Sequence, residues 1–286
     1  MLDNLYIKVT NKCNLNCPFC YINRSKINHL NTKEICRSID LYPAVHIIFH
    51  GGEPTLYPKQ LNEIIDKYSD KSFSITSNFM FTMNKEIEKL FSRVEANTSY
   101  SIDRFQTKEQ EQKFLRNIRW YKENFENPLT LLVTLTERQL KQNPKELCTF
   151  ILDEINPDFI LFERLYDPSK DENFYKKTDL YLKECFQYIP YHKNLLYKRM
   201  QYSLLYNISV FPVNCSQVQK IINEDGSEQT CTNTLNIKQS FSSDCLTCKY
   251  YRYCQCDCQC FRYKDGFCRF PKNTFDFVKG TLDEEF

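Results

Sequence analysis

Between residues 4 and 163, short apolar runs alternate with longer amphipathic stretches. The short runs favour β-branched, aromatic and leucine residues and predict strands at residues 4–10, 45–50, 72–76, 98–102, 129–135 and 159–163. The longer stretches repeat apolar residues every three or four positions and predict helices at residues 58–70, 84–94, 108–125 and 144–155. Strands and helices therefore alternate along this part of the chain.

This alternation predicts an α/β fold, because consecutive strands joined through helices run parallel with right-handed crossovers. Six strands favour an open, partial (β/α)6 TIM-like barrel or a doubly wound sheet over a closed eight-stranded barrel. In either architecture ligands bind at the carboxyl ends of the strands. The residues that directly follow each predicted strand are therefore the first candidates for a site.

After residue 163 the pattern changes. Residues 168–206 are predicted to be helical, and the sequence KIINEDGSEQT that follows at 220–230 predicts a β-hairpin with an Asp-Gly turn. Nine of the fifteen cysteines lie between Cys215 and Cys268, in a stretch with little apolar core that would need bound metal to fold. We expect two domains, at residues 1–206 and 207–286.

Composition and charge exclude several classes of function. The formal net charge is +2, from 38 basic and 36 acidic residues, which gives no electrostatic footprint for nucleic acid or an anionic membrane. The amino-terminal residues do not form a signal peptide, and no apolar run approaches the roughly 20 residues that cross a bilayer. We expect a cytoplasmic protein without nucleic-acid or membrane partners.

Dense cysteine use in a reducing compartment indicates metal binding or catalysis rather than disulfides. Cys13, Cys17 and Cys20 follow the first predicted strand with the spacing Cys-x₃-Cys-x₂-Cys. Three thiolates can hold three irons of a [4Fe–4S] cluster and leave the fourth iron open to a small molecule. The alternative is a structural zinc site with a distant fourth ligand. We expect the isolated Cys36, Cys148 and Cys185 to be buried and to pack as small apolar residues.

The motif CNLNCPFC, with Phe19 before the third cysteine, resembles the signature of radical S-adenosylmethionine (SAM) enzymes. The resemblance implies that the amino and carboxylate groups of SAM chelate the open iron. It also implies that an electron from the cluster cleaves SAM to a 5′-deoxyadenosyl radical, which abstracts a hydrogen from the substrate. Cys13, Cys17 and Cys20 would then be the catalytic cluster ligands.

Three further stretches resemble cofactor-binding motifs of this family. GGEP directly follows the second strand, and its backbone and glutamate would bind the methionine amino group. In SITSNF, Phe79 replaces the usual glycine, and SID resembles a Ser-x-Asp near ribose or substrate. The alternative for the last two is that strand-end polar residues satisfy the loop backbone. The cofactor-binding residues implied are Phe19, Gly51, Gly52, Glu53, Pro54, Asn78, Ser101 and Asp103.

The cysteine-rich tail resembles the SPASM extension of this family, with four residues between Gly226 and Cys231 in the Cys…Gly-x₄-Cys pattern. The resemblance implies an outer auxiliary [4Fe–4S] cluster on Cys245, Cys248, Cys254 and Cys268, and an inner one on Cys215, Cys231 and Cys258. The fourth ligand of the inner cluster stays open between Cys256, Cys260 and the substrate. A two-zinc ribbon is the alternative for the tail. Three clusters and SAM are the expected cofactors.

The resemblance implies an enzyme that installs a crosslink, thioether, epimerisation or oxidation in a ribosomally made peptide or protein. A small-molecule radical SAM dehydrogenase of the aminocyclitol or alcohol type and a non-catalytic iron–sulfur electron carrier are the alternatives. The first strand begins near the start of the chain, so we expect the barrel, the tail or a separate leader-peptide-binding protein to recognise the peptide. Flavodoxin or ferredoxin is the expected reductant. The sequence leaves open the substrate, the oligomeric state, and whether Cys148 or Cys185 donates a hydrogen.

Overall fold

The structure is a computed structural model that describes residues 2–20, 22–165, 169–208, 219–229, 243–254 and 267–285. The chain divides into two compact units. The first unit comprises Met1–Leu131 and Asn214–Thr234, and the second comprises Leu132–Val213 and Leu235–Phe286. The fold is α/β with a mostly parallel sheet, as the alternation of strands and helices predicts.

The sheet of the first unit contains the cysteine motif at the end of its first strand. Its strands are β1 (Leu2–Thr10), β2 (Ala44–Gly51), β3 (Ser72–Thr76), β4 (Glu95–Tyr100), β7 (Gln219–Ile222) and β8 (Glu228–Gln229). Their order in the sheet is β4-β3-β2-β1-β7-β8. The pairs β1–β2, β2–β3 and β3–β4 are parallel, which confirms the prediction for this part of the chain.

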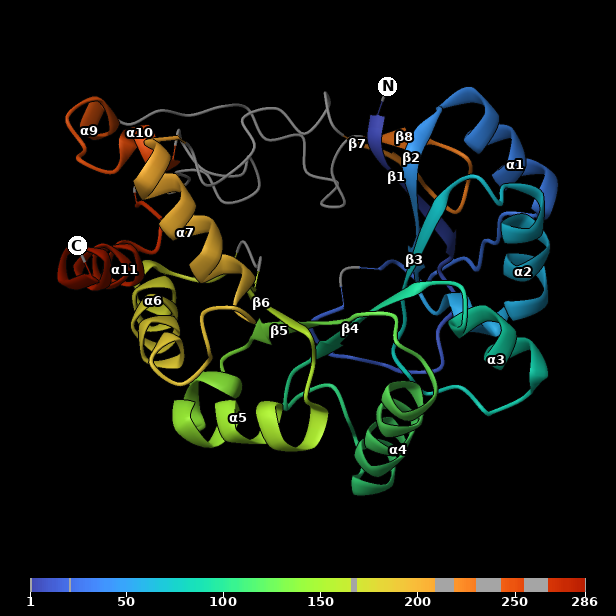
Figure 1. Ribbon diagram of the computed structural model, residues 1–286, viewed down its shortest axis with the longest axis horizontal. Coiled ribbons are helices and arrows are strands. Elements are labelled where there is room, and N and C mark those ends of the chain that lie inside the picture. The colour runs from blue at the N-terminus through green and yellow to red at the C-terminus, as the bar shows by residue number, and fades with distance from the viewer. Residues whose placement is uncertain are drawn as a thin grey trace. The chain divides into compact units, whose positions relative to one another are not determined.

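Helices cover one side of this sheet because alternate strand residues are apolar. Leu5, Ile7 and Val9 of β1 are buried on one face, and the residues between them point to the other. Figure 1 shows α1, α2 and α3 lying along one side of the strands. The helices of this unit are α1 (Thr32–Leu41), the 3₁₀ turn η1 (Pro54–Leu56), α2 (Pro58–Lys67), α3 (Lys85–Phe91) and α4 (Lys108–Asn124).

The predicted hairpin is present, but it also extends the main sheet. Strands β7 and β8 are antiparallel, and Gly226 in their turn has φ +81°, a conformation that favours glycine. Strand β7 additionally pairs in parallel with β1. A largely buried ion pair, with 3.2 Å between Lys8 Nζ and Glu224 Oε2, joins β1 to the turn of this hairpin. The sequence did not predict this attachment, and the domain boundary at residues 206/207 stays a prediction.

The second unit contains the remaining strands and helices. β5 (Leu129–Leu135) begins at the end of the first unit and continues into the second. The other elements are η2 (Gln139–Lys141), α5 (Pro144–Phe150), the π-helical segment η3 (Ile151–Ile155), β6 (Phe159–Arg164), α6 (Glu172–Phe186), α7 (Leu195–Tyr206), α9 (Ser243–Leu246), α10 (Tyr251–Cys254) and α11 (Lys272–Glu285).

A buried carboxylate on α6 fixes the start of α11. Asp179 accepts hydrogen bonds from the backbone N–H groups of Asn273 at 2.9 Å and Thr274 at 3.0 Å. It also accepts from the Thr274 hydroxyl at 2.7 Å. The first N–H groups of a helix have no partner within it, so a carboxylate from another helix can cap them. This contact explains how the carboxyl-terminal helix is held within the second unit.

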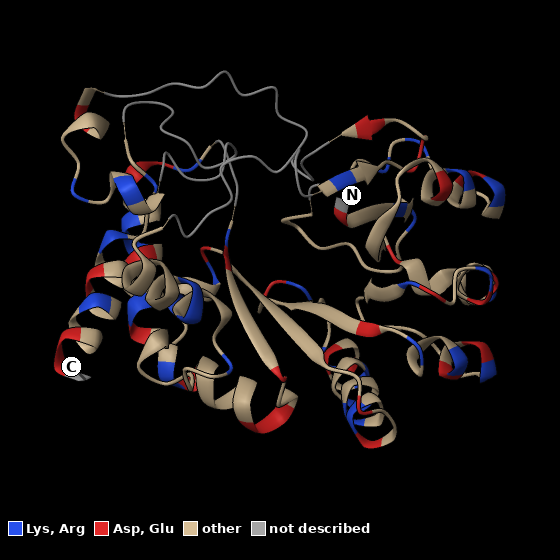
Figure 2. Ribbon diagram, turned by 45° about the horizontal axis from the view of Figure 1, so that its top comes forward, with Lys and Arg blue, Asp and Glu red and all other residues tan. Residues whose placement is uncertain are grey.

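Charged residues are mixed along the helices of both units. Figure 2 shows acidic and basic residues interspersed on the helices, whereas most of the strand surface is neither. No helix among the described residues has the length and apolar character needed to cross a membrane. The expected absence of nucleic-acid and membrane partners, and the cytoplasmic location, stay predictions.

Candidate active site

The cysteine motif lies in a loop that directly follows β1 and is closed by one buried asparagine. Asn11, only 2% exposed, accepts a hydrogen bond from the Asn28 N–H at 2.8 Å. Its side-chain amide donates to the carbonyls of Asn23 at 3.0 Å and Lys26 at 2.6 Å. One side chain thus satisfies the backbone on the returning arm of the loop and holds both arms together. Sequence reasoning missed Asn11, although a short amide two residues before the first cysteine is a typical loop-closing residue.

Two glycines let the turn after β2 pass against this loop. The Gly52 N–H donates to the Thr10 carbonyl at 2.6 Å, and the Glu53 N–H donates to the Lys12 carbonyl at 2.8 Å. A Cβ atom on Gly52 would lie 2.1 Å from the Lys12 carbonyl oxygen. A Cβ atom on Gly51, whose φ is +127°, would lie 2.4 Å from the Thr10 carbonyl oxygen. Both positions therefore require glycine.

Glu53 is completely buried, and its carboxylate is held by the protein itself. One oxygen accepts from the Thr55 N–H at 3.0 Å, the Thr55 hydroxyl at 2.6 Å and the Ser77 hydroxyl at 2.9 Å. The other accepts from the Asn78 N–H at 2.7 Å. Burial raises the pKa of Glu53, and these hydrogen bonds oppose that rise. The carboxylate therefore joins the GGEP turn to the end of β3, while its role towards methionine stays a prediction.

The end of β3 also reaches the first cysteine. The side-chain amide of Asn78 donates to Asn14 Oδ1 at 2.6 Å and approaches Cys13 Sγ at 3.5 Å. The Leu15 N–H approaches the same sulfur at 3.4 Å. The structure thus brings together the first cysteine, Glu53 and Asn78, which come from three separate motifs of the sequence.

Phe79, at the position where the family often has glycine, adopts a left-handed backbone. Its φ is +57°, a conformation that is strained for a bulky residue. The ring is fully buried, and it packs against Phe91 and Tyr121 with ring centroids 5.3 and 5.8 Å away. The side chain of Asn117 donates to its carbonyl at 2.8 Å. Aromatic packing thus stabilises a backbone turn that glycine would adopt without strain.

Substitution of Phe79 tests this balance. We expect Phe79→Ala to lower the free energy of unfolding by about 3–5 kcal/mol, because it leaves a cavity in the aromatic core. Phe79→Gly loses the same ring but relieves the left-handed strain, so it should be more stable than Phe79→Ala by about 1 kcal/mol. Denaturant unfolding measures both. At Arg116, exposed within α4, alanine should instead be more stable than glycine by about 1 kcal/mol. If the alanine variant were more stable than the glycine variant at position 79 as well as at position 116, the backbone strain at Phe79 would be contradicted.

The second and third cysteines each lie near an arginine. Cys17 Sγ is 3.9 Å from the carbonyl oxygen of Arg104, and Cys20 Sγ is 3.4 Å from Nη2 of Arg24. The other guanidinium nitrogen of Arg24 donates to the Leu15 carbonyl. Sequence reasoning missed both arginines. Arg24 could have been found from its position four residues after the last cysteine, whereas Arg104 is brought to the loop only by tertiary folding.

The remaining predicted cofactor residues lie where the strands end. Ser101 is buried, and its hydroxyl accepts from the Asp103 N–H at 3.4 Å. This contact agrees with the alternative interpretation, in which a polar residue at a strand end satisfies the loop backbone. Pro54 is buried as the first residue of η1, and Phe19 is half-buried in the cysteine loop. Cofactor binding by these residues and by Asp103 stays a prediction.

The donor chemistry of the loop fits an iron–sulfur cluster. Cys13, Cys17 and Cys20 are half-buried free thiols in one loop, and thiolates are the usual ligands of such clusters. Burial raises the pKa of Cys13 and Cys17, so binding of a metal would be coupled to loss of their protons. Within the described residues, no three His, Cys, Asp or Glu side chains are arranged to hold a metal ion. Joint ligation therefore stays a prediction.

The fold and these residues define an α/β protein with a cysteine-based candidate active site at the carboxyl ends of parallel strands. The family model described as the Radical SAM superfamily matches residues 7–157, more than half of the chain. The chain therefore belongs to the radical SAM superfamily and is a radical SAM enzyme. Membership implies a SAM-binding [4Fe–4S] cluster and SAM as cofactors.

Relatives share part of this chain. The uncharacterized protein MJ0907 of Methanocaldococcus jannaschii is 30% identical over 112 residues, which are 36% of this chain and 39% of the relative. The "Putative glycyl-radical enzyme activating enzyme MJ1227" of the same organism is 32% identical over 81 residues, 27% of this chain and 34% of the relative. An uncharacterized protein of Archaeoglobus fulgidus is 27% identical over 104 residues, 34% of this chain and 25% of the relative. The chain thus spans well under half of each of these relatives.

Solved structures show distant likenesses. BtrN in complex with AdoMet and 2-DOIA gives a TM-score of 0.34 at 12% identity, with 81% of this chain and 73% of that chain covered. A probable 2-pyrone-4,6-dicarboxylic acid hydrolase from Acinetobacter baumannii gives 0.36 at 12% identity, with 68% and 67% covered. At these scores the substrates of both proteins say nothing about the substrate of this chain.

The tail cysteines are only partly described. Cys215, Cys231, Cys256, Cys258 and Cys260 lie outside the described residues. The other four predicted tail ligands are free thiols: Cys245, Cys248, Cys254 and Cys268. The segment that carries the first three contacts α11. The Tyr250 hydroxyl donates to Asp276 at 2.5 Å, and the Tyr253 ring lies tilted against Phe275 with centroids 4.8 Å apart. Cys268 lies between Phe267 and Arg269, and the Arg269 guanidinium lies 4.7 Å from the Tyr175 ring. Both auxiliary clusters stay predictions.

The three isolated cysteines are buried, as expected. Cys148 and Cys185 are completely buried, and Cys36 is 8% exposed. Cys148 Sγ lies 3.8 Å from the Cys185 carbonyl oxygen, so these thiols face protein groups between α5 and α6. This environment does not favour either thiol as a hydrogen donor to a substrate.

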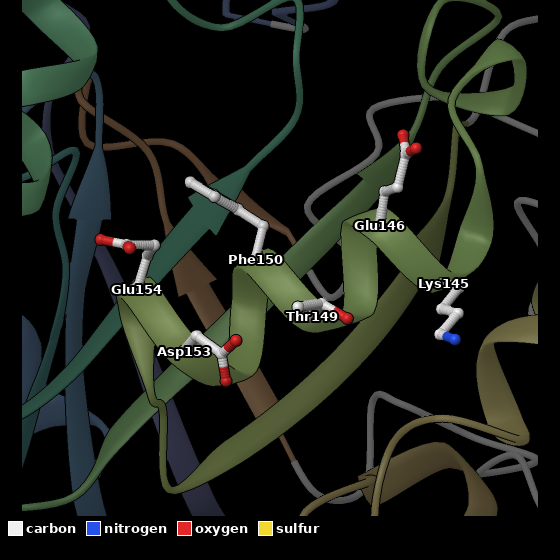
Figure 3. A pocket seen from close by; sticks show the side chains of 6 residues that line it. All are labelled: Lys145, Glu146, Thr149, Phe150, Asp153 and Glu154. Carbon is white, nitrogen blue, oxygen red and sulfur yellow. The ribbon is translucent and has the colours of Figure 1, made fainter.

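A hollow of about 360 Å³ lies on the second unit, and none of the residues that line it is a predicted site residue. Its lining consists of Lys145, Glu146, Thr149, Phe150, Asp153 and Glu154. All six come from one continuous helical stretch, α5 and η3, and Figure 3 shows their polar groups pointing in different directions. No common ligand position is defined, so we assign this hollow no function.

Proposed function

We propose that this radical SAM enzyme modifies a ribosomally made peptide or protein by abstracting one of its hydrogens. When bound, the cluster and SAM supply an electron and a 5′-deoxyadenosyl radical for this reaction. The observation that carries the proposal is the fixed contact between the cysteine loop, the GGEP turn and the end of β3. A non-catalytic electron carrier would not need this arrangement around a three-thiolate set.

In this proposal each part of the site has a separate task. Cys13, Cys17 and Cys20 hold the cluster. The turn of Gly51 to Pro54 presents its backbone to the methionine part of SAM, and the close approach of Gly52 to Lys12 keeps that turn beside the cysteines. Asn78, Ser101 and Asp103 lie at neighbouring strand ends, where the remainder of SAM and the substrate would bind.

The cysteine-rich tail supports a peptide substrate. Its spacing resembles SPASM, and in this proposal residues 207–286 form an auxiliary domain with two more [4Fe–4S] clusters. The name of the relative MJ1227 describes a putative enzyme that activates another enzyme, which is consistent with a protein substrate. We further propose flavodoxin or ferredoxin as reductant and a separate leader-peptide-binding protein as partner.

Iron content and SAM cleavage test the chemistry. Protein prepared without oxygen should contain about twelve irons in three [4Fe–4S] clusters, with little zinc, and should release 5′-deoxyadenosine from SAM after reduction. Cys17→Ala should abolish that release and lose about four irons. The control Cys36→Ala, a buried cysteine of α1 outside the site, should keep both. A protein that binds only zinc would contradict the proposal.

A separate experiment tests the substrate. We expect co-expression with a short peptide encoded beside the gene to change the mass of that peptide, and the Cys17→Ala variant to leave it unchanged. Release of 5′-deoxyadenosine that depends on an added amino sugar or alcohol, with no peptide modified, would instead indicate the small-molecule dehydrogenase.

A further inference from the structure

We infer that Lys8 and Glu224 are positioning residues that connect the hairpin of β7 and β8 to the turn that would bind SAM. Their ion pair runs from the turn of this hairpin to β1, with 3.2 Å between Lys8 Nζ and Glu224 Oε2. The inference rests on the proposed function, because it assumes that the turn of Gly51 to Pro54 binds the methionine part of SAM. It assigns the hairpin a part in SAM binding that none of the sequence motifs contains.

The register of the sheet places the hairpin turn at the carboxyl end of β1. β7 runs parallel to β1 with Ile222 opposite Ile7, and Glu224 follows two positions further along, near the end of β1. The carboxyl ends of parallel strands meet at one edge of a sheet. The cysteine loop and the GGEP turn also begin at this edge, after β1 and β2. The hairpin turn therefore lies at the same edge as the candidate active site.

Hydrogen bonds inside the hairpin turn fix the backbone that carries Glu224. The Gly226 N–H donates to the Asn223 carbonyl at 2.9 Å, and the Asn223 N–H donates to the Ser227 carbonyl at 2.8 Å. The neighbouring carboxylate, Asp225, accepts from the Ser227 N–H at 2.9 Å and from its hydroxyl at 2.6 Å. Asp225 is therefore used within the turn, whereas Glu224 reaches out of it to β1.

The stem of Lys8 lies directly against the first glycine of the GGEP turn. A Cβ atom on Gly51 would lie 3.1 Å from Lys8 Cγ, and Lys8 is opposite His50 in the register of β1 and β2. Lys8 is only 7% exposed. Burial, and the charge of Lys8, lower the pKa of His50 to about 3, so this histidine is uncharged at neutral pH. Glu224 supplies a carboxylate to the buried ammonium group.

Loss of the Glu224 charge is expected to move Lys8. A buried ammonium group is costly to keep in place when its carboxylate is removed. The lysine side chain is long and flexible, so its ammonium group can turn towards water, and its stem would then leave Gly51. The N–H groups of Gly52 and Glu53, which anchor the turn to the cysteine loop, would be held less firmly.

Hydrogen exchange of the turn, measured without SAM, tests the first step. We expect Glu224→Gln to speed exchange of the Gly52 and Glu53 amide protons about tenfold, because the hydrogen bonds that protect them open more often. Glu228→Gln is the matched control, since it breaks a 2.8 Å ion pair with Lys220 that lies within the same hairpin. The control should leave the exchange unchanged. Unchanged exchange in Glu224→Gln would overturn the inference.

Binding of SAM tests the second step. With the iron content unchanged, Glu224→Gln should raise the Kd for SAM about tenfold. The double variant Lys8→Met/Glu224→Gln should bind SAM within about threefold of the wild type, because methionine keeps an unbranched stem against Gly51 and leaves no charge to pair. A double variant as weak as Glu224→Gln would also overturn the inference, since Glu224 would then not act through Lys8.

A second variant keeps the inference testable if Glu224→Gln does not fold. Glu224→Asp keeps the charge but shortens the reach to Lys8, so it should speed the exchange and raise the Kd for SAM by about threefold each. Wild-type values in both measurements would overturn the inference for this variant as well. A wild-type protein that binds no SAM although it contains its iron would instead overturn the proposed function.

Discussion

Replacing Gly52 with alanine is expected to reduce the formation of 5′-deoxyadenosine by at least about 100-fold, because it displaces the turn that faces the cysteines. The added Cβ atom would lie 2.1 Å from the Lys12 carbonyl oxygen and 2.6 Å from its carbonyl carbon. Both are backbone atoms, so no side chain can move aside to relieve the contact. The two chain segments must separate.

Separation would break the hydrogen bonds that align these segments. The Gly52 N–H would lose the Thr10 carbonyl, and the Glu53 N–H would lose the Lys12 carbonyl. The effect would therefore reach the start of the cysteine loop and the buried glutamate together. Rate of SAM cleavage and iron content should be measured on the same preparation, since a displaced loop would lower both.

The chain offers a matched control for this substitution. Gly280, within α11, has no atom within 4 Å of the position its Cβ would take. Gly280→Ala should leave SAM cleavage unchanged and raise the stability of the protein by about 1 kcal/mol, because alanine is the better helix former. Wild-type SAM cleavage by Gly52→Ala would show that the two loops do not need this close approach.

The strands could be predicted because local pattern and tertiary packing agree. β3 and β5 have the predicted bounds, Ser72–Thr76 and Leu129–Leu135. β4 begins at Glu95, three residues before the predicted strand. The prediction missed these residues because the sequence EAN has little intrinsic strand preference. Alternate residues from Ala96 onwards are nonetheless buried. Helix α1 was missed although Asn31 and Glu34 form a capping box at its start.

The partners of the site could not be predicted in the same way, because they depend on distances in space. Cys17 and Arg104 are 87 residues apart in sequence, and Glu53 and Asn78 are 25 apart. Spacing rules find thiolates that lie within one loop, but they do not identify which buried side chain faces each sulfur. The parallel pairing of β7 with β1 was missed for a similar reason, since an Asp-Gly turn indicates a hairpin but not the strand that it joins.

The structure gives Glu53 a positioning role in addition to the cofactor-binding role that stays a prediction. The resemblance implies that its carboxylate binds the methionine ammonium, yet the carboxylate is completely buried and accepts four hydrogen bonds from three residues. A carboxylate that is already saturated with donors acts first as a positioning group. It holds Ser77 and Asn78, and through Asn78 it acts on the surroundings of Cys13.

Glu53→Gln separates these two roles. The amide that replaces one oxygen is a donor, so either the Asn78 N–H or the Thr55 and Ser77 donors would lose their acceptor in a buried place. We expect the free energy of unfolding, measured without SAM, to fall by about 2–3 kcal/mol. Glu123→Gln, at an exposed position of α4, should change it by less than about 0.5 kcal/mol.

A measurement of SAM binding completes the test of Glu53. If Glu53 served only as a ligand for the methionine ammonium, removal of its buried charge would leave the free energy of unfolding without SAM unchanged or slightly higher. Only the Kd for SAM would then rise. If it positions Asn78, stability without SAM falls in Glu53→Gln, and the weaker binding of SAM follows from the displaced loop. An unchanged unfolding curve combined with weaker SAM binding would therefore contradict the positioning role.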